Sequence, residues 1–193
     1  MSVTNTLRSF GMGNLLIYHE IRAVEARFGL NLQPKGRVGQ DQENPYFARF
    51  EAELRKDAAM MARHYEVFYC LENSIRGFIS DIMEGAFGPG WWEEKVDPAV
   101  KDEARKNKTR EEELGVAPRS DQAIDYVTFG QLGKIIEQNW DVFAGVLRNR
   151  QAVSRVMYSL NTLRGPIAHC SPLPEDEVVR LKLALQDWFR QME

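Results

Sequence analysis

Residues 47–82 read FARFEAELRKDAAMMARHYEVFYCLENSIRGFISDI. Apolar side chains in this stretch recur in alternating steps of three and four residues, the spacing that lines one face of an α-helix. We therefore predict one long helix that begins at Pro45, with room for a kink, and ends before Gly88, Pro89 and Gly90. The apolar stripe of this helix consists of Phe47, Phe50, Leu54, Ala58, Met61, Tyr65, Phe68, Ile75, Ile79 and Ile82.

Helical patterns also precede and follow the long helix. We predict a first helix at residues 15–28, a polar loop at residues 31–44, and a charged helix that Asp97 caps and Pro98 begins. Trp91 and Trp92 are expected to close one end of the core. Short helices are expected at residues 128–138 and 141–148. No segment shows the alternation of a β-strand, so the sequence predicts an all-α fold, a helical bundle.

Two stronger amphipathic patterns follow toward the C-terminus. A helix is predicted at residues 151–163, and Gly165 with Pro166 is expected to interrupt it. A final helix is predicted at residues 175–191, because three acidic residues favour its N-terminus. The side chains expected in the core are Val153, Val156, Met157, Leu160 and Leu163 from the first of these helices, and Val178, Leu181, Leu185, Trp188 and Phe189 from the second.

The chain has 193 residues, of which 44% are hydrophobic. This length suits one domain over residues 1–193, with residues 1–44 as an N-terminal helix and loop and residues 45–193 as the helical core. The first residues lack the pattern of a secretion signal, and no stretch has the roughly 20 apolar residues of a membrane span. We expect a cytoplasmic protein with no membrane partner. Cys70 and Cys170 lack a CxxC spacing and are expected to be reduced, with Cys170 packed in the interior.

The formal net charge of −3 argues against a protein that coats nucleic acid nonspecifically, so any such contact must be local. Arg148 and Arg155 are seven residues apart and so are expected on one helix face, where they are candidate contacts for a nucleic-acid backbone. A solvated cationic face is an equally good interpretation. The stretch between Asp141 and Glu175 contains no acidic residue and carries the cationic or titratable side chains Arg148, Arg150, Arg155, Arg164 and His169.

Two charged residues fall on apolar helix stripes. On an ideal helix Glu72 lies on the same face as Phe68 and Ile75. Arg164 likewise lies on the face of its own helix that is expected to be buried. Ions removed from water are costly unless they are paired. Glu72 therefore pairs with Arg164, or with Arg76 one turn away, or else these groups line a cleft that substrate enters. The residues alone leave these alternatives evenly balanced.

The predicted break at Gly165 and Pro166 bears on His169. If the helix continued, the His169 side chain would point roughly 140° away from that of Arg164. A break would let both side chains reach one cleft. For His19 and His64 we prefer the ordinary interpretation, a hydrogen-bonded structural histidine.

Residues 160–170, LNTLRGPIAHC, resemble the Arg-x4-6-His signature of HEPN domains (higher eukaryote and prokaryote nucleotide-binding), with a spacer of four. The chain is more specifically similar to the branch found in a eukaryotic nuclear messenger-RNA quality-control endoribonuclease and in many bacterial defence-like proteins. The closer similarity rests on MARHYEVFYCLENSIRGFI, GPGWWEEKV, FGQLGKIIEQNWDVF and EDEVVRL, which with the signature cover roughly residues 60–181.

The resemblance implies a helical bundle, commonly homodimeric, in which the signatures of two protomers meet in one cleft. Arg164 and His169 map onto the motif as the catalytic pair. Glu72 matches an acidic residue on an earlier helix that faces the motif, and Asn161 lies one turn before Arg164; with Arg76 these are the expected supporting residues. A defence or toxin role is implied by the bacterial members.

The implied chemistry is cleavage of RNA without a metal ion or other cofactor. The 2′-hydroxyl attacks the adjacent phosphorus, a reaction that suits histidine because this side-chain type titrates near neutral pH. His169 is expected to transfer protons, while Arg164 holds the phosphate oxygens. The histidines show neither HxxxH nor HExxH spacing, so we expect no metal site.

Two alternatives remain open. Gly165 stands where many active HEPN members carry a polar residue, which favours a non-catalytic module that binds RNA, nucleotide or protein. A subunit controlled by a regulatory or antitoxin protein partner is the second alternative. Cys170 is not expected to act as a nucleophile with His169, because adjacent side chains seldom face each other as nucleophile and base must.

Overall fold

The computed structural model describes residues 46–193, and these residues are helical with no β-strand. The all-α prediction is thereby confirmed. The helix predicted at residues 15–28 and the loop at residues 31–44 lie outside the described residues. The chain divides into two compact units, residues 1–51 and 52–193. The described part of the first unit holds one short 3-10 helix, η1 (Phe47–Arg49). The single domain over residues 1–193 stays a prediction.

The long helix α2 (Ala52–Phe87) runs uninterrupted for 36 residues and ends before Gly88, as predicted. It begins later than Pro45, because Phe50 is in extended backbone conformation. Its predicted stripe is buried only from Phe68 onward, while Leu54 and Tyr65 are exposed. Apolar spacing describes one face of a helix, but it does not say over what length a neighbour covers that face.

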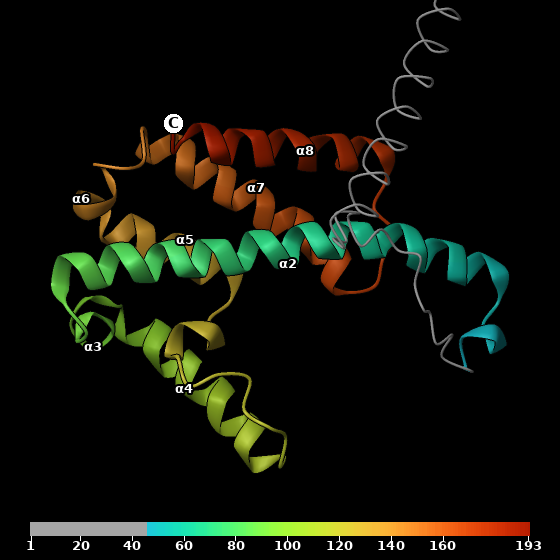
Figure 1. Cartoon of the computed structure of the whole chain (residues 1–193), viewed down its shortest axis with the longest axis horizontal. Helices are drawn as coiled ribbons and strands as arrows, with labels where there is room; N and C mark the ends of the chain where they lie inside the picture. Colours follow the sequence, from blue (N-terminus) through green and yellow to red (C-terminus); the bar gives the residue numbers. More distant parts are fainter. Residues whose placement is uncertain (1–45) are drawn as a thin grey trace, which may run out of the picture. The chain divides into compact units, whose positions relative to one another are not determined.

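The remaining helices of the second unit pack around α2 (Figure 1). In Figure 1, α7 (Arg150–Ala168) and α8 (Glu175–Arg190) lie on one side of α2, while α3 (Trp91–Lys95) and α4 (Pro98–Glu113) lie on the other. Helix α5 (Phe129–Gln138) packs against both α2 and α7. A 3-10 helix, η2 (Ala123–Tyr126), packs against α4. None of the described helices is long and apolar enough to cross a membrane.

One core joins α2, α5, α7 and α8. Phe78 of α2 bridges to the C-terminal helix, with its ring 6.3 Å from that of the buried Trp188. Trp91 is buried, and the half-buried Trp92 packs against the same core with its ring 5.6 Å from that of Trp91, so both tryptophans close the core as predicted. The centre of this core consists of Ile75, Ile79, Met83, Leu132, Ile135, Ile136, Val153, Leu160 and Trp188.

Helix α4 begins as the sequence predicts. The Asp97 carboxylate accepts a hydrogen bond from the Ala99 amide at 2.8 Å, and Pro98 occupies the first helical position, where its missing amide hydrogen costs nothing. Apart from Val100 and Ala104, this charged helix buries little, which agrees with a solvated helix.

The predicted interruption of helix α7 at Gly165 and Pro166 is wrong, because the helix runs through both residues. It begins at Arg150 and continues through Gly165 and Pro166 to Ala168. Pro166 lacks an amide hydrogen and so removes one helical hydrogen bond, the one to the carbonyl of Thr162. The helix tolerates this loss because Leu163 and Ile167, on either side of the proline, are both buried.

Two further predictions near the C-terminus need correction. The helix predicted at residues 141–148 is the single turn α6 (Trp140–Phe143), which gives way to a turn containing Gly145. Phe189 is exposed and Val178 is only half-buried. Phe189 follows the buried Trp188 and lies about 100° around the helix from it, on a side of α8 where it borders a surface hollow rather than the core.

Candidate functional site

A buried carboxylate, Glu72, binds two arginines. Its Oε2 accepts a hydrogen bond from Nε of Arg164 at 2.8 Å, and its Oε1 accepts one from Arg76, one turn along α2. The side chains of Glu72 and Arg76 are only 11% and 14% exposed, whereas that of Arg164 is 38% exposed. Both of the pairings that the sequence left as alternatives are therefore formed at once.

The same groups line a cavity of about 410 Å³, so pairing and cleft are not exclusive. Aromatic rings of α2 and the last turn of α7 form its apolar walls. The polar part of the lining consists of Glu72, Asn73, Arg76, Arg119, Asp125 and Arg164.

Arg164 is the lining residue best placed to bind an anion. Only its Nε is engaged, by Glu72, and its two terminal nitrogens have no acceptor among the described residues. Because guanidinium carries its donors in a rigid planar fork, fixing Nε also fixes the direction of the terminal nitrogens. Glu72 thus holds Arg164 ready to receive phosphate oxygens without occupying all of its donors.

Arg76 is held from three sides. Besides Glu72, it has the carbonyl of Val127 at 3.5 Å from Nη2 and the Asp125 carboxylate at 3.9 Å from Nε. The Nε itself is buried without a hydrogen-bond partner. These contacts join α2 to η2 and make Arg76 a part of the cavity's framework, as expected of a supporting residue.

Arg119, which the sequence did not single out, reaches the cavity from the loop after α4. It donates hydrogen bonds from Nε, at 2.8 Å, and from Nη2 to the Glu111 carboxylate. The hydrogen bonds to Arg119 hold the pKa of Glu111 below its usual value, and the same hydrogen bonds raise the pKa of Arg119. The Arg119 guanidinium also lies over the ring of Tyr126, 5.2 Å from its centroid.

His169 is exposed and does not line this cavity. It is the residue that ends α7, with its amide bound to the carbonyl of Gly165 at 3.0 Å. In the two residues that follow, the Cys170 amide donates to the carbonyl of Ile167, and the Ser171 amide donates to the carbonyl of Pro166. This is the Schellman pattern of helix termination. Since α7 does not break, the premise that a bend aims His169 at the Arg164 cleft is wrong for a single chain.

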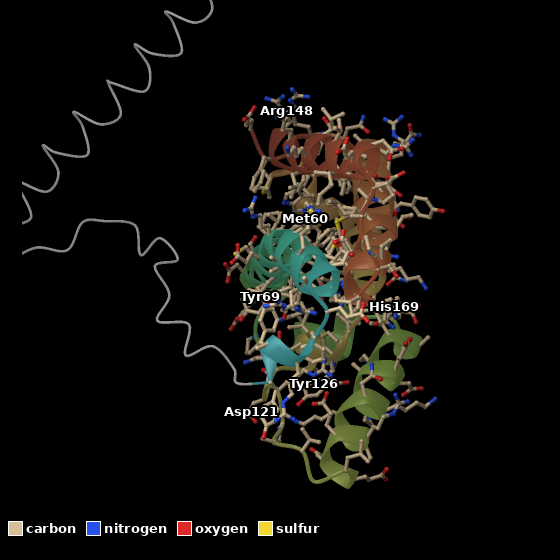
Figure 2. All side chains as sticks on the ribbon, turned by 90° about the vertical axis from the view of Figure 1, so that its right-hand side faces the viewer. Met60, Tyr69, Asp121, Tyr126, Arg148 and His169 are labelled. Atoms are coloured by element: carbon tan, nitrogen blue, oxygen red, sulfur yellow. The ribbon has the colours of Figure 1, made fainter. Side chains whose placement is uncertain are left out.

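The other predicted residues lie elsewhere. Asn161 is exposed on α7, and its side-chain amide lies beside Gly130 of α5 rather than at the cavity. Arg148 precedes α7, so it does not share a helix face with Arg155 as predicted; in Figure 2 it lies far from His169. Arg155 lines a separate surface hollow between α7 and α8 together with Arg180 and Asp187.

Two further observations concern metal binding and the two cysteines. Among residues 46–193 no group of three or more histidine, cysteine or acidic side chains is arranged to hold a metal ion. Cys70 and Cys170 are both free and exposed, so the expectation that Cys170 packs in the interior is wrong. Cys170 instead has a backbone φ of +56°, the left-handed conformation that a helix needs at this position.

The sequence missed several lining residues for identifiable reasons. Tyr65 was assigned to the buried stripe of α2, and Tyr69 lies on no apolar stripe. Arg119 comes from the irregular segment that follows α4 and Asp125 from the single-turn helix η2, and both segments are too short for apolar spacing to predict where a side chain points.

Residues 66–193 match the family described as Swt1-like HEPN, and this range covers more than half of the chain. It includes Glu72, Arg164 and His169. No curated protein and no solved structure matches the chain.

Proposed function

Because the chain belongs to the Swt1-like HEPN family, we propose that it is a metal-independent endoribonuclease whose site is formed by Arg164 and His169 of two protomers. HEPN domains are generally related to ribonucleases and commonly form dimers that bind RNA. The observation that carries the proposal is the position of Arg164: it lies at a cavity, oriented by Glu72, with its terminal nitrogens open.

The reaction is an intramolecular transesterification within RNA. One His169 removes the proton of the 2′-hydroxyl, whose oxygen attacks the adjacent phosphorus. The bond from phosphorus to the 5′-oxygen breaks, and that oxygen receives a proton from a second histidine. The products are a 2′,3′-cyclic phosphate and a 5′-hydroxyl, and no oxidant, metal ion or cofactor enters the balance.

Arg164 stabilises the charge that grows on the phosphate oxygens during attack. Its terminal nitrogens offer a pair of parallel donors, which match two oxygens of one phosphate. Donors that are already oriented before the substrate arrives need no rearrangement in the transition state. Glu72 and Arg76 are therefore positioning residues, which act on the phosphate only through Arg164.

The place of His169 supports the proposal of a second protomer. Within one protomer this side chain lies outside the Arg164 cavity, at the exposed end of α7. A second copy that packs against this end would bring the partner subunit's His169 to the same cleft and supply both the base and the acid. A nuclease of this kind fits a defence or toxin role, held in check until it is needed.

One observation favours a second candidate, a HEPN module that binds RNA without cutting it. Arg164 already has a carboxylate partner in Glu72, as a purely structural arginine would. In that case the ion pair ties α7 to α2, and His169 has no catalytic task.

The test is cleavage of a labelled structured RNA in excess EDTA. Wild type is compared with His169→Ala and with the matched control His64→Ala, which removes the other described histidine from a part of α2 that does not line the cavity. We expect EDTA-resistant cleavage by wild type and His64→Ala, and a loss of at least about 100-fold in His169→Ala. If no protein cleaves but all three bind RNA equally, the binding module is correct instead.

The product ends provide an independent criterion. Cleavage through the 2′-hydroxyl must leave a cyclic phosphate, and a substrate with a single 2′-deoxy sugar at the cut site must resist cleavage there. Fragments that carry 5′-phosphate ends would reject this chemistry even if His169→Ala were inactive.

A further inference from the structure

Two tyrosines stand exposed beside the Arg164 cavity. Tyr65 and Tyr69 lie one turn apart on α2, each 60% exposed, and both line the cavity. Phe68, between them in sequence, also lines the cavity but is buried, and its ring packs against that of Phe129 of α5 with the centroids 6.5 Å apart. This part of α2 therefore presents aromatic rings both to the core and to the cavity mouth.

The tyrosine rings are arranged as a small aromatic surface. Their centroids are 6.2 Å apart and their planes are inclined by 38°. No hydrogen bond to either hydroxyl is formed among the described residues, so neither ring is held by its polar end. Large aromatic faces left open to water beside an arginine with open donors are typical of sites where unpaired bases stack.

Positive and negative side chains balance at the cavity, so affinity for RNA requires contacts such as this stacking. The three arginines that line it face the carboxylates of Glu72 and Asp125, and Glu111 binds Arg119 from outside the lining. Three positive and three negative charges leave no net field to attract a polyanion. Arg164 offers directed hydrogen bonds to one phosphate, but the rest of the binding free energy must come from uncharged contacts.

We propose that Tyr65 and Tyr69 form a stacking platform for an unpaired base next to the phosphate that Arg164 receives, so that these two side chains give the site a preference for unpaired over paired RNA. This inference rests on the proposed function and specifies its substrate. Bases within a duplex are stacked on each other and cannot offer their faces to the tyrosines. Loops, bulges and free ends can, and the platform favours no particular base because every base has a flat face.

The experiment measures binding rather than cleavage, so that its outcome is separate from that of the proposed nuclease activity. Every protein is the full chain carrying His169→Ala, which leaves the RNA intact. The ligand is a fluorescently labelled single-stranded oligoribonucleotide, with a perfect duplex of the same length for comparison, and the readout is fluorescence anisotropy. Tyr65→Ala and Tyr69→Ala are compared with the ring-retaining variants Tyr65→Phe and Tyr69→Phe.

We expect each alanine variant to bind the single strand about 10-fold more weakly, and each phenylalanine variant to bind within about 2-fold of the parent. Tyr158→Ala is the matched control, since Tyr158 is an exposed tyrosine of α7 that does not line the cavity, and it should bind as the parent does. Duplex binding should be unchanged throughout. The proposal is overturned if the alanine variants bind the single strand as tightly as the parent, or if the phenylalanine variants lose as much affinity as the alanine variants.

Discussion

Glu72 shows how one residue can have a structural and a functional role at the same time. A carboxylate that is only 11% exposed requires a counter-charge, and Arg76, itself 14% exposed, supplies it within α2. The second oxygen of Glu72 is then free to orient Arg164 from α7. The more exposed arginine keeps donors available, while the buried one does not.

Removing the Glu72 carboxylate should therefore destabilise the protein as well as inactivate it. Glu72→Ala leaves Arg76 buried beside Arg164 without the acid that separates them, and we expect the free energy of unfolding to fall by about 3 kcal/mol. Glu72→Gln retains one acceptor and should lose about half as much. Urea denaturation followed by circular dichroism measures both values.

Asp81→Asn provides the control for the Glu72 variants, because Asp81 is an exposed acid on the same helix with no partner among the described residues. It should change the free energy of unfolding by no more than about 0.5 kcal/mol. A Glu72→Ala protein as stable as Asp81→Asn would show that the arginines turn to water freely, and the positioning role of Glu72 would then have to be abandoned.

The sequence singled out Glu72 and Arg164 because charges on an apolar stripe are anomalous without any structure, and Arg76 because it lies one helical turn from Glu72. It could not choose between their pairings, because both partners lie within reach of one carboxylate. Tyr69 escaped notice because it lies on no apolar stripe, and Tyr65 escaped notice for the opposite reason. An aromatic residue at helical spacing agrees with a buried face, and only the absence of a covering neighbour shows that it is exposed.

Among the elements, the C-terminal end of α7 has the most consequence for the site. The helix stops after Ala168 because Cys170 adopts a φ of +56° and the amides of Cys170 and Ser171 turn back to carbonyls of the last turn. This conformation places His169 at an exposed helix end. Glycine is the residue that adopts it with least strain, yet the chain carries cysteine there.

Relief of this strain is testable. Cys170→Gly should raise the free energy of unfolding by about 1 kcal/mol. Glycine removes the strain that a side chain causes in the left-handed region, and part of this gain is offset because glycine has more conformational freedom in the unfolded chain. Thermal unfolding should show the midpoint rising by about 2–4 °C. Cys170→Ala, which keeps a Cβ atom, is the matched control and should stay near wild type. Equal midpoints for the two variants would mean that Cys170 is not strained.

The spacing of apolar residues predicted most of these helices and erred where tertiary packing decides. The sequence placed the C-terminal end of α2, both ends of α8 and the start of α4 well, since glycine, proline and acidic residues mark those positions. It failed at Gly165 and Pro166, where local preference favours a break. Burial of Leu163 and Ile167 on both sides outweighs the one hydrogen bond that proline removes.

At the scale of the whole molecule, the folded chain separates the two residues that the HEPN motif pairs. Arg164 opens into the cavity between α2 and α7, while His169 lies outside it. Spacing in the sequence could not reveal this, because four intervening residues suit either a broken helix or a continuous one. The proposed reaction needs a histidine beside the phosphate on Arg164, which is why the proposal includes a second protomer.

A dimer with one altered chain distinguishes a shared cleft from two independent sites. Wild-type and His169→Ala chains carrying different tags are co-expressed, and the mixed dimer is isolated by purification on both tags in succession. If one cleft uses both histidines, the loss of either removes the base or the acid, and cleavage should fall by about 100-fold relative to the wild-type dimer. The mixed dimer of wild type with His64→Ala should retain full activity. Independent sites would instead leave the wild-type and His169→Ala dimer with about half of the activity, since in a symmetric dimer one of the two sites would be untouched.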